Sequence, residues 1–308
     1  MHKTGNVSLK KYLDLNGWNE ITIDDKETFD DILRKSNVQA SEFSFTNLFL
    51  WRKYYDFRFK VIDGALIMIA CNPEVPYVLM PLSRMEPGTV RQAAGVITEI
   101  FRSNSLVPKL ARVDKDGLSV LKEAGITYET LRDEANDDYV YLRENLEELK
   151  GKRYDGKRNH IRRLHKEHKV DYVKVSPENM TFAEKVMSEW FTLREMPGEA
   201  PERFALADLV KYYEKLECTG GILLVDDIPA GVTFGEMLNK DTAVIHFEKA
   251  SQFMSGVYPA INQSFVADTW HDAMYINREQ DLGLPGLRRS KQSYCPVKMI
   301  EKYTVMLS

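Results

Sequence analysis

The chain has 308 residues, of which 44% are hydrophobic, enough for two globular domains that each bury a core. Its 42 basic and 46 acidic side chains give a net charge of -4, which excludes a general nucleic-acid binder and confines polyanion contacts to a local basic segment. The first eighteen residues lack an apolar core of signal-peptide length, the longest apolar run is too short for a membrane span, and no CxxC pair occurs. A cytoplasmic location is therefore expected.

Apolar spacing and turn residues predict alternating strands and helices in the first half. A strand leading into a helix is expected over 21–37, a helix over 45–55, and a hairpin over 58–70 with Asp63 and Gly64 in its turn. A strand at 76–82, a helix at 88–103, a strand at 108–113, a helix at 118–123 and a strand at 126–132 complete the series. This alternation favours helices packed on a mixed sheet.

The polar, acidic stretch 133–138 has no apolar anchor, so we expect two domains, 1–138 and 139–308. A strand turning into a short helix that ends at Gly151 opens the second domain. Its further elements are expected as a strand at 170–176, helices at 180–196 and 206–218, a hairpin over 220–238 that turns at Asp226 and Asp227, a strand at 242–250, a helix at 258–270, a strand at 273–279 and a closing segment at 297–307. The shared order of elements indicates an internal duplication.

A basic segment at 150–169 dominates the charge pattern, with nine Lys or Arg against two acidic residues. At 100° per residue, one side of the predicted helix carries Tyr154, Ile161, Leu164 and His168, and another carries Asn159, Arg162, Lys166 and Lys169. The pattern indicates a helix docked by one edge with a cationic face outward, which suits phosphate or carboxylate. A merely solvated face is the alternative.

A second polar concentration occupies 277–296, directly after a predicted strand. Gly283, Pro285 and Gly286 predict a kinked loop that opens a helix, whose N-terminal amides favour an anion. Arg288, Lys291 and Gln292 share a face of that helix, and we expect it to border a common crevice with the basic segment. The alternative is a structural loop with a solvated helix.

Glu248 ends an apolar strand, where partial burial would raise its pKa, and this makes it a candidate proton acceptor; pairing with an Arg is the alternative. Between that strand and the next helix, acetyltransferases of the GNAT type hold coenzyme A on a Q/R-x-x-G-x-G/A loop, of which this chain has only Gln252 and Gly256. Ordinary coenzyme A use is therefore not favoured. The histidines of the basic segment lack a carboxylate cluster, so no metal site is predicted.

The segments YLRENLEELKGKRYDGKRNHIRRL, HFEKA with GVYPAIN downstream, and NREQDLGLPGLRRSKQSYCPV together resemble bacterial proteins related to the C-terminal domain of phosphatidylglycerol lysyltransferase. FSFTNLFLWRKYY and the first hairpin are similar to the N-terminal half of the same family. The resemblance covers nearly the whole chain, and its last thirty residues are the most specific. The chain departs from the family in showing no membrane domain, so the resemblance alone does not predict a lipid acceptor.

The resemblance implies an α/β (α+β) fold of two tandem GNAT-like domains, with mixed central sheets flanked by helices, as in the Fem aminoacyl transferases. It implies transfer of an acyl or aminoacyl group, from aminoacyl-tRNA in such relatives, to an amine or hydroxyl of a lipid or peptidoglycan precursor. Glu248 would take the catalytic role, and the donor would be bound by Lys157, Arg158, Asn159, Arg162, Asn262, Asn277, Arg278, Glu279, Arg288, Lys291 and Tyr294.

Two other functions stay open from the sequence. One is a non-catalytic GNAT-like module that binds an anionic metabolite or partner, and the other is an acyl-CoA-dependent N-acetyltransferase. No tightly bound cofactor is expected, and the expected partners are a tRNA 3′ end or another phosphate-bearing donor and a small-molecule, lipid or peptide acceptor. The basic helix also allows peripheral contact with an anionic membrane.

Overall fold

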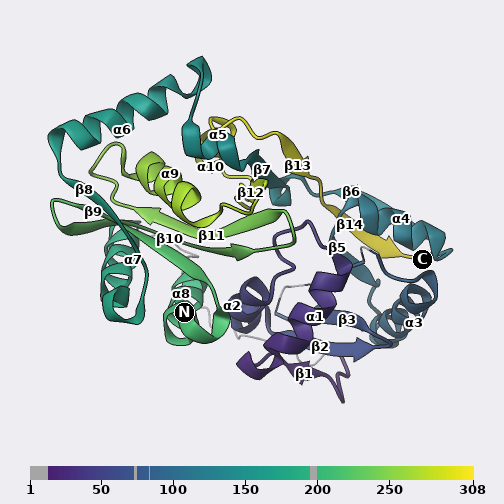
Figure 1. Ribbon diagram of the computed structural model, residues 1–308. Helices are drawn as coiled ribbons and strands as arrows, with labels where there is room; N and C mark the ends of the chain where they lie inside the picture. The colour runs from purple at the N-terminus through teal and green to yellow at the C-terminus, as the bar shows by residue number, and fades with distance from the viewer. Residues whose placement is uncertain (1–12, 73–74, 83, 195–199) are drawn as a thin grey trace, which may run out of the picture. The chain divides into compact units, whose positions relative to one another are not determined.

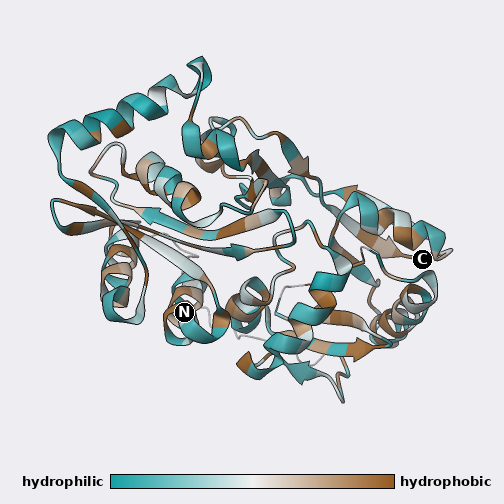
Figure 2. Ribbon diagram, in the orientation of Figure 1, coloured by the Kyte–Doolittle hydropathy of each residue, from teal (hydrophilic) through white to brown (hydrophobic). Residues whose placement is uncertain are grey.

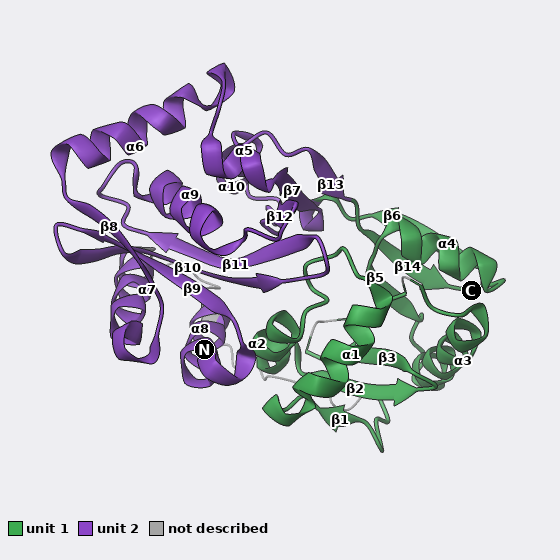
Figure 3. Ribbon diagram, in the orientation of Figure 1, with its two compact units in different colours: residues 1–134, 301–308 green, residues 135–300 purple. Residues whose placement is uncertain are grey.

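The computed structural model describes residues 13–72, 75–82, 84–194 and 200–308 (Figure 1). The expected absence of a signal peptide concerns the start of the chain, whose first twelve residues lie outside these ranges. The chain divides into two compact units, residues 1–134 with 301–308 and residues 135–300 (Figure 3). Within the described ranges, no helix combines the length and the apolar character that crossing a bilayer requires.

The first unit contains a seven-stranded sheet of order β1-β2-β3-β4-β5-β14-β6. Its strands are β1 (Asn19–Glu20), β2 (Phe57–Ile62), β3 (Ala65–Ala70), β4 (Tyr77–Leu79), β5 (Lys109–Val113), β6 (Tyr128–Arg132) and β14 (Tyr303–Leu307). Its helices are η2 (Ile23–Asp25), α1 (Lys26–Ser36), α2 (Phe45–Tyr55), α3 (Pro87–Ser103) and α4 (Lys115–Glu123), with η3 (Glu134–Asn136) at the junction of the units. Only β4 and β5 pair in parallel among these strands.

Local chemistry explains the predicted elements of this unit. Ser44 caps α2, because its hydroxyl accepts a hydrogen bond of 3.1 Å from the backbone N–H of Asn47. Asp63 and Gly64 take the positive φ angles, 47° and 82°, that a two-residue hairpin turn requires. Within the aromatic-rich α2, Phe45 and Phe49 are buried and stack with ring centroids 5.5 Å apart.

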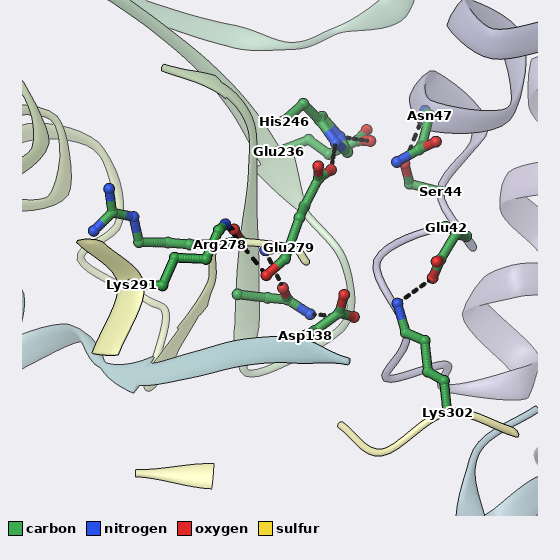
Figure 4. Close-up of polar contacts among 11 residues, drawn as sticks. Glu42, Ser44, Asn47, Asp138, Glu236, His246, Arg278, Glu279, Lys291 and Lys302 are labelled. Carbon is green, nitrogen blue, oxygen red and sulfur yellow. Dashed lines mark hydrogen bonds and ion pairs between the residues drawn. The ribbon is translucent and has the colours of Figure 1, made fainter. Parts of the chain in front are cut away.

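The closing segment 297–307 forms two strands in two different sheets. β13 (Lys298–Ile300) pairs with β7 in the second unit, whereas β14 lies between β5 and β6 in the first. Lys302, which follows β13, is completely buried, and its Nζ donates to Glu42 at 2.5 Å (Figure 4). Residues 301–308, which the sequence placed in the second domain, therefore pack in the first unit, because strand pairing and a buried ion pair hold them there.

The second unit contains a sheet of order β13-β7-β12-β11-β10-β9-β8. Its remaining strands are β7 (Asp138–Leu142), β8 (Val170–Lys174), β9 (Thr219–Val225), β10 (Ile228–Met237), β11 (Thr242–Ala250) and β12 (Tyr275–Asn277). Its helices are α5 (Arg143–Glu148), η4 (Lys152–Tyr154), α6 (Asp155–Glu167), η5 (Pro177–Asn179), α7 (Met180–Arg194), α8 (Ala200–Leu216), α9 (Val257–Thr269) and α10 (Pro285–Gln292). In Figure 1, α9 covers one face of this sheet and α7 and α8 cover the other.

The two sheets repeat one plan. Counted from β1 and from β8, the fourth and fifth strands form the parallel pair in each sheet, and the second and third form the hairpin. The second hairpin turns at Asp226 and Asp227, with φ angles of 52° and 63°. The two sheets thus share the order of elements on which the predicted duplication depends.

The end of α5 differs from the prediction. α5 ends at Glu148 with the buried Leu149 in the left-handed region (φ 50°), and Gly151 (φ 90°) precedes η4 instead of capping α5. Arg158, on α6, donates to the carbonyls of Leu149 and Gly151. A side chain thus binds carbonyl groups just after the end of α5, where the helix itself provides no N–H donor.

Candidate functional site

The candidate site lies where β11 and β12 stop pairing. Their parallel register runs from Thr242 opposite Tyr275 to Val244 opposite Asn277, and only β11 continues. Beyond this point, Arg278 Nη2 donates to Glu248 Oε1 at 2.7 Å, and Asn262 Nδ2 on α9 donates to Glu248 Oε2 at 2.8 Å. Both carboxylate oxygens of Glu248 are therefore engaged, as the alternative of an Arg-paired carboxylate predicted.

Arg278 keeps an unused donor group, Nη1. Its guanidinium lies 4.5 Å from the ring centroid of Tyr294 and its side chain is 12% exposed. Nη1 of Arg278 and Oδ1 of Asn262 are both buried without a hydrogen-bond partner among the described residues. Burial opposes the charge of Arg278, but Glu248 outweighs it and raises the Arg278 pKa above its ordinary value. A cationic donor and a neutral acceptor thus flank one carboxylate, each with bonding capacity left.

His246 sits between two carboxylates (Figure 4). Its Nε2 lies 2.8 Å from Glu236 Oε1 and its Nδ1 lies 2.9 Å from Glu279 Oε1. Burial opposes protonation, but the hydrogen bonds to the two carboxylates prevail and raise the His246 pKa to about 9. The ring is thus a charged structural group at neutral pH. A metal site is a separate question: within the described ranges, no group of three or more His, Cys, Asp or Glu side chains could hold a metal ion.

Asn277 and Glu279 shape the turn that follows β12. Asn277 is fully buried, its Nδ2 donates to Asp138 at 3.0 Å, and its Oδ1 accepts from the backbone N–H of Glu279 at 2.8 Å. Both ends of this amide are therefore used within the fold. Glu279 takes a positive φ of 57°, which directs its side chain to His246.

The three predicted donors of α10, Arg288, Lys291 and Gln292, do not point together toward a free anion-binding site. Arg288 Nε donates to Asp281 Oδ2 at 2.7 Å, and Lys291 Nζ donates to the carbonyls of Arg278 and Glu279. Burial, together with the nearby Arg278 charge, lowers the Lys291 pKa to about 8. Gln292 is exposed. Lys291 therefore supports the turn carrying Arg278, and the anion-binding role of Arg288 and Lys291 stays a prediction.

α6 has the predicted amphipathic form, and its ribbon is almost entirely hydrophilic in Figure 2. Leu164, and Tyr154 at the end of η4, are buried, whereas Asn159, Arg162 and Lys166 on the opposite side and Lys169 just after α6 are exposed. Arg162 Nη1 donates to Asn159 Oδ1 at 3.1 Å on that face. Arg158 is instead bound to Asp155 and to two backbone carbonyls. Of the basic residues chosen from the sequence, Arg162 keeps the most accessible charge.

The start of α6 and the end of α10 meet at Tyr294. Lys157 Nζ donates to Ser293 Oγ at 2.7 Å and lies 3.6 Å from the Tyr294 ring centroid, and the Tyr154 hydroxyl donates to the Tyr294 carbonyl at 3.0 Å. Burial and the Arg278 charge lower the Lys157 pKa to about 8. The two cationic segments therefore do come together, and Tyr294 lies between Lys157 and Arg278.

α6 also lies against the N-terminus of α9. Gly256, the N-cap of α9, has φ 100°, and a Cβ placed there would be 2.6 Å from the His160 carbonyl oxygen and 3.2 Å from the Leu164 Cβ. Ser255 Oγ and His160 Nδ1 share a hydrogen bond of 2.8 Å. The glycine is thus required by the close approach of a neighbouring helix.

Sequence reasoning missed Asp281, Tyr139 and Glu236. Asp281 is 1% exposed and binds Arg288, the Tyr139 hydroxyl at 2.7 Å and the backbone N–H of Gly283 at 2.8 Å. Asp281 lies seven positions before Arg288 in the sequence, so its proximity to Arg288 could have been predicted, but its burial could not. Glu236 lies on β10 opposite Val244 of β11, so the antiparallel pairing of these two strands brings it beside His246.

The family model described as "Phosphatidylglycerol lysyltransferase, C-terminal" matches residues 33–306. A search of curated proteins finds no match to the chain. Among solved structures, a conserved protein of unknown function from Bacteroides thetaiotaomicron is 32% identical, with a TM-score of 0.87 over 95% of this chain and 99% of the other.

Two further structures share the fold at low identity. L-PGS from Bacillus licheniformis is 14% identical, with a TM-score of 0.63 over 91% of both chains. A tandem GNAT protein from the clavulanic acid biosynthesis pathway is 10% identical, with a TM-score of 0.51 over 94% of this chain and 97% of the other. Each unit is accordingly a GNAT-like mixed sheet flanked by helices, as the resemblance implied. With nearly its whole length matched by the family model, the chain belongs to the family of the phosphatidylglycerol lysyltransferase C-terminal domain.

Proposed function

We propose that the chain transfers an aminoacyl group from an aminoacyl-tRNA to an amine or hydroxyl acceptor. Membership of the family supports transferase chemistry at a coarse level. The observation that carries the proposal is the unused Nη1 of Arg278, held by Glu248 at the divergence of β11 and β12 and linked through Tyr294 to the basic helix α6.

The reaction needs no nucleophilic side chain of the protein. The acceptor nitrogen or oxygen attacks the ester carbonyl carbon of the donor, a bond forms between them, the carbon–oxygen bond to the ribose breaks, and the acceptor proton ends on the ribose oxygen. Arg278 Nη1 would donate to the oxyanion that develops on the carbonyl. Glu248 and Asn262 would hold Arg278 in place, which is a positioning role.

The predicted role of Glu248 as proton acceptor stays a prediction. Its two oxygens already accept from Arg278 and Asn262, so proton transfer would require one of these bonds to be exchanged. Lys157 is a second candidate for proton transfer, because its pKa of about 8 places it near neutral pH and its side chain is only partly buried.

The exposed cations of α6 support a tRNA donor. Arg162 and Lys166 project from one exposed face, as phosphate binding along a nucleic-acid strand requires. The packing of α6 argues against acyl-coenzyme A in the manner of acetyltransferases. His160 and Leu164 occupy the close approach to Gly256 at the N-terminus of α9, where a pyrophosphate would otherwise meet free amides.

A non-catalytic binding module is the second candidate, and a specific observation favours it. Glu248, Lys291 and Asn277 all have their polar atoms bonded within the fold. Their neighbours Arg278 and Asn262 each have one buried polar atom without a hydrogen-bond partner among the described residues. Such a module would use the cationic face of α6 for binding and would have no turnover.

A transfer assay decides between these functions. The chain is incubated with tRNAs charged with radiolabelled amino acids, or in parallel with labelled acyl-coenzyme A, and with amine, hydroxyl, peptide and phosphatidylglycerol acceptors. We expect label transfer from charged tRNA only, lost in Arg278→Lys with tRNA affinity retained. Arg163→Gln, which removes an exposed arginine paired with Glu167 on α6, is the control. Transfer from acyl-coenzyme A alone, or neither transfer nor tRNA binding at low salt, would contradict the proposal.

A further inference from the structure

A pocket of about 280 Å³ lies in the second unit beside α7. Among the described residues, its apolar lining consists of Val186, Trp190 and Leu193 on α7, Ala230 near the start of β10, Ala250 at the end of β11, and Phe253 in the segment that follows. A cavity of about 150 Å³ holds one benzene ring. This pocket is therefore large enough for a fused two-ring system.

Trp190 is a fixed wall of the pocket. The residue is 7% exposed, and its indole Nε1 donates to the Tyr258 hydroxyl at 2.9 Å. Lys249 Nζ lies 3.8 Å from the ring centroid of Trp190 and 2.8 Å from Glu202 Oε1, so the cation beside the indole is already paired. Because these partners hold the indole in place, a ligand would bind without the entropy cost of ordering this side chain.

Two large apolar side chains of the lining are open to solvent. Leu193 is 48% exposed, and Phe253 is 79% exposed, more than any other large apolar side chain of the described residues. A ligand in the pocket would remove this apolar surface from water. Concave apolar surfaces with a few polar groups are the usual binding sites of small molecules.

The polar part of the lining carries a negative charge. Glu189 lines the pocket, is exposed, and forms no hydrogen bond or ion pair with the residues that the structure describes. The other polar lining residues of the described ranges, Ser188, Thr192 and Ser251, are uncharged. The described lining contains no Lys, Arg or His. Glu189 therefore attracts a cationic ligand and repels an anionic one.

These features favour a small cationic ligand over a phosphate carrier or a protein. Coenzyme A and nucleotides carry several negative charges, which Glu189 repels and which no cation of the described lining would offset. A protein partner would bury about 800 Å² of surface on each side, whereas the exposed apolar surface at this pocket comes from two side chains.

We propose that the pocket binds a small aromatic amine, whose ring packs against Trp190 and Phe253 and whose ammonium group lies at Glu189. Aromatic side chains favour edge or offset contacts with another ring, and an ammonium group donates charge-assisted hydrogen bonds to a carboxylate. The site requires neither Arg278 nor a charged tRNA. It is therefore independent of the transfer reaction proposed above.

Isothermal titration calorimetry of the full chain with three probes tests the ring and the charge separately. We expect tryptamine to bind, and indole-3-propionate to bind about fivefold more weakly because its carboxylate meets Glu189. Butylamine, which has the charge without the ring, should show no heat of binding. Phe253→Ser should weaken tryptamine binding about tenfold. Glu189→Gln should make the two indole ligands bind equally.

The controls match each variant in residue type. Phe204→Ser removes a phenylalanine that is 67% exposed on α8, and Glu184→Gln removes an exposed carboxylate from α7; neither residue lines the pocket. Both controls should bind tryptamine as the wild type does. The proposal is overturned if tryptamine does not bind, if Phe253→Ser leaves its affinity unchanged, or if the preference for tryptamine survives Glu189→Gln. Equal weakening by Phe204→Ser and Phe253→Ser would also overturn it, because the amine would then bind elsewhere.

Discussion

Arg278 and Glu248 form an ion pair of 2.7 Å that joins the turn after β12 to the part of β11 that no longer pairs with β12. The two strands stop pairing at Val244 and Asn277, so this side-chain bond replaces the backbone hydrogen bonds that a continuous sheet would have made. Because the pair is mostly buried, it depends on both partners being present.

Glu248→Gln separates the two roles considered for this carboxylate. The glutamine keeps the shape but leaves Arg278 without a counter-charge, so we expect about 3 kcal/mol less stability and about a hundredfold slower transfer. If Glu248 positions Arg278, the pH profile of the residual activity keeps its shape. Loss of the acidic limb of that profile would instead identify Glu248 as the proton acceptor. Glu167→Gln, from an exposed pair with Arg163, is the control.

Removing charge from the exposed face of α6 should change the salt dependence of tRNA binding. Arg162→Gln and Lys166→Gln are each expected to lower the slope of log affinity against log salt by about 1, because one phosphate contact is lost. Filter binding over a range of salt concentrations measures it. Lys35→Gln, on the exposed side of α1, should leave the slope unchanged. Equal slopes for all three variants would show that α6 does not contact the tRNA.

Gly256→Ala should loosen α6 from α9. The added Cβ would lie 2.6 Å from a backbone carbonyl, at a backbone angle that L-residues rarely adopt, so we expect about 1–3 kcal/mol less stability in urea unfolding. Gly156→Ala, in the first turn of α6 with open space around it, should be neutral or stabilising by up to about 1 kcal/mol. Equal stability of the two variants would show that α6 does not approach α9 so closely.

His246 should make stability depend on pH. Its folded pKa of about 9 lies above the ordinary 6.5, so its stabilisation is complete below about pH 6.5 and is lost as the pH rises through 9. The difference amounts to about 3 kcal/mol at most. Urea unfolding of the wild type and His246→Gln should show a gap between them that narrows from pH 6 to pH 9. A gap that stays constant from pH 6 to pH 9 would mean that the His246 ring is neutral.

Lys157 should react faster with amine-directed reagents than an exposed lysine does. Its pKa of about 8 leaves a much larger neutral fraction at pH 8 than the ordinary 10.5 allows, and its side chain is only partly buried. Competitive acetylation followed by mass spectrometry should give Lys157 an inflection near pH 8, with the exposed Lys35 as reference. Reactivity that parallels Lys35 at every pH would contradict the lowered pKa.

The sequence by itself determined the elements whose signal is local. The 3.6-residue period predicted the buried side of the basic segment at Tyr154 and Leu164, and the Asp63–Gly64 and Asp226–Asp227 turns marked the equivalent hairpins of the two units. The resemblance of whole segments to a known family implied the tandem fold, because such a resemblance is read from the sequence without knowledge of contacts.

Only the tertiary structure decided which polar groups remain available. Lys302 lies two residues after the end of β13, and no local pattern reveals its burial or its pairing with Glu42, 260 positions earlier. Lys291 and Asn277 look in the sequence like ligand-binding groups, yet their atoms are consumed by backbone and side-chain partners across the second unit. Whether a polar group finds a hydrogen-bond partner depends on distant segments that meet only when the sheets form. For this reason the structure, and not the sequence, identified Arg278 as the residue with an unused donor group.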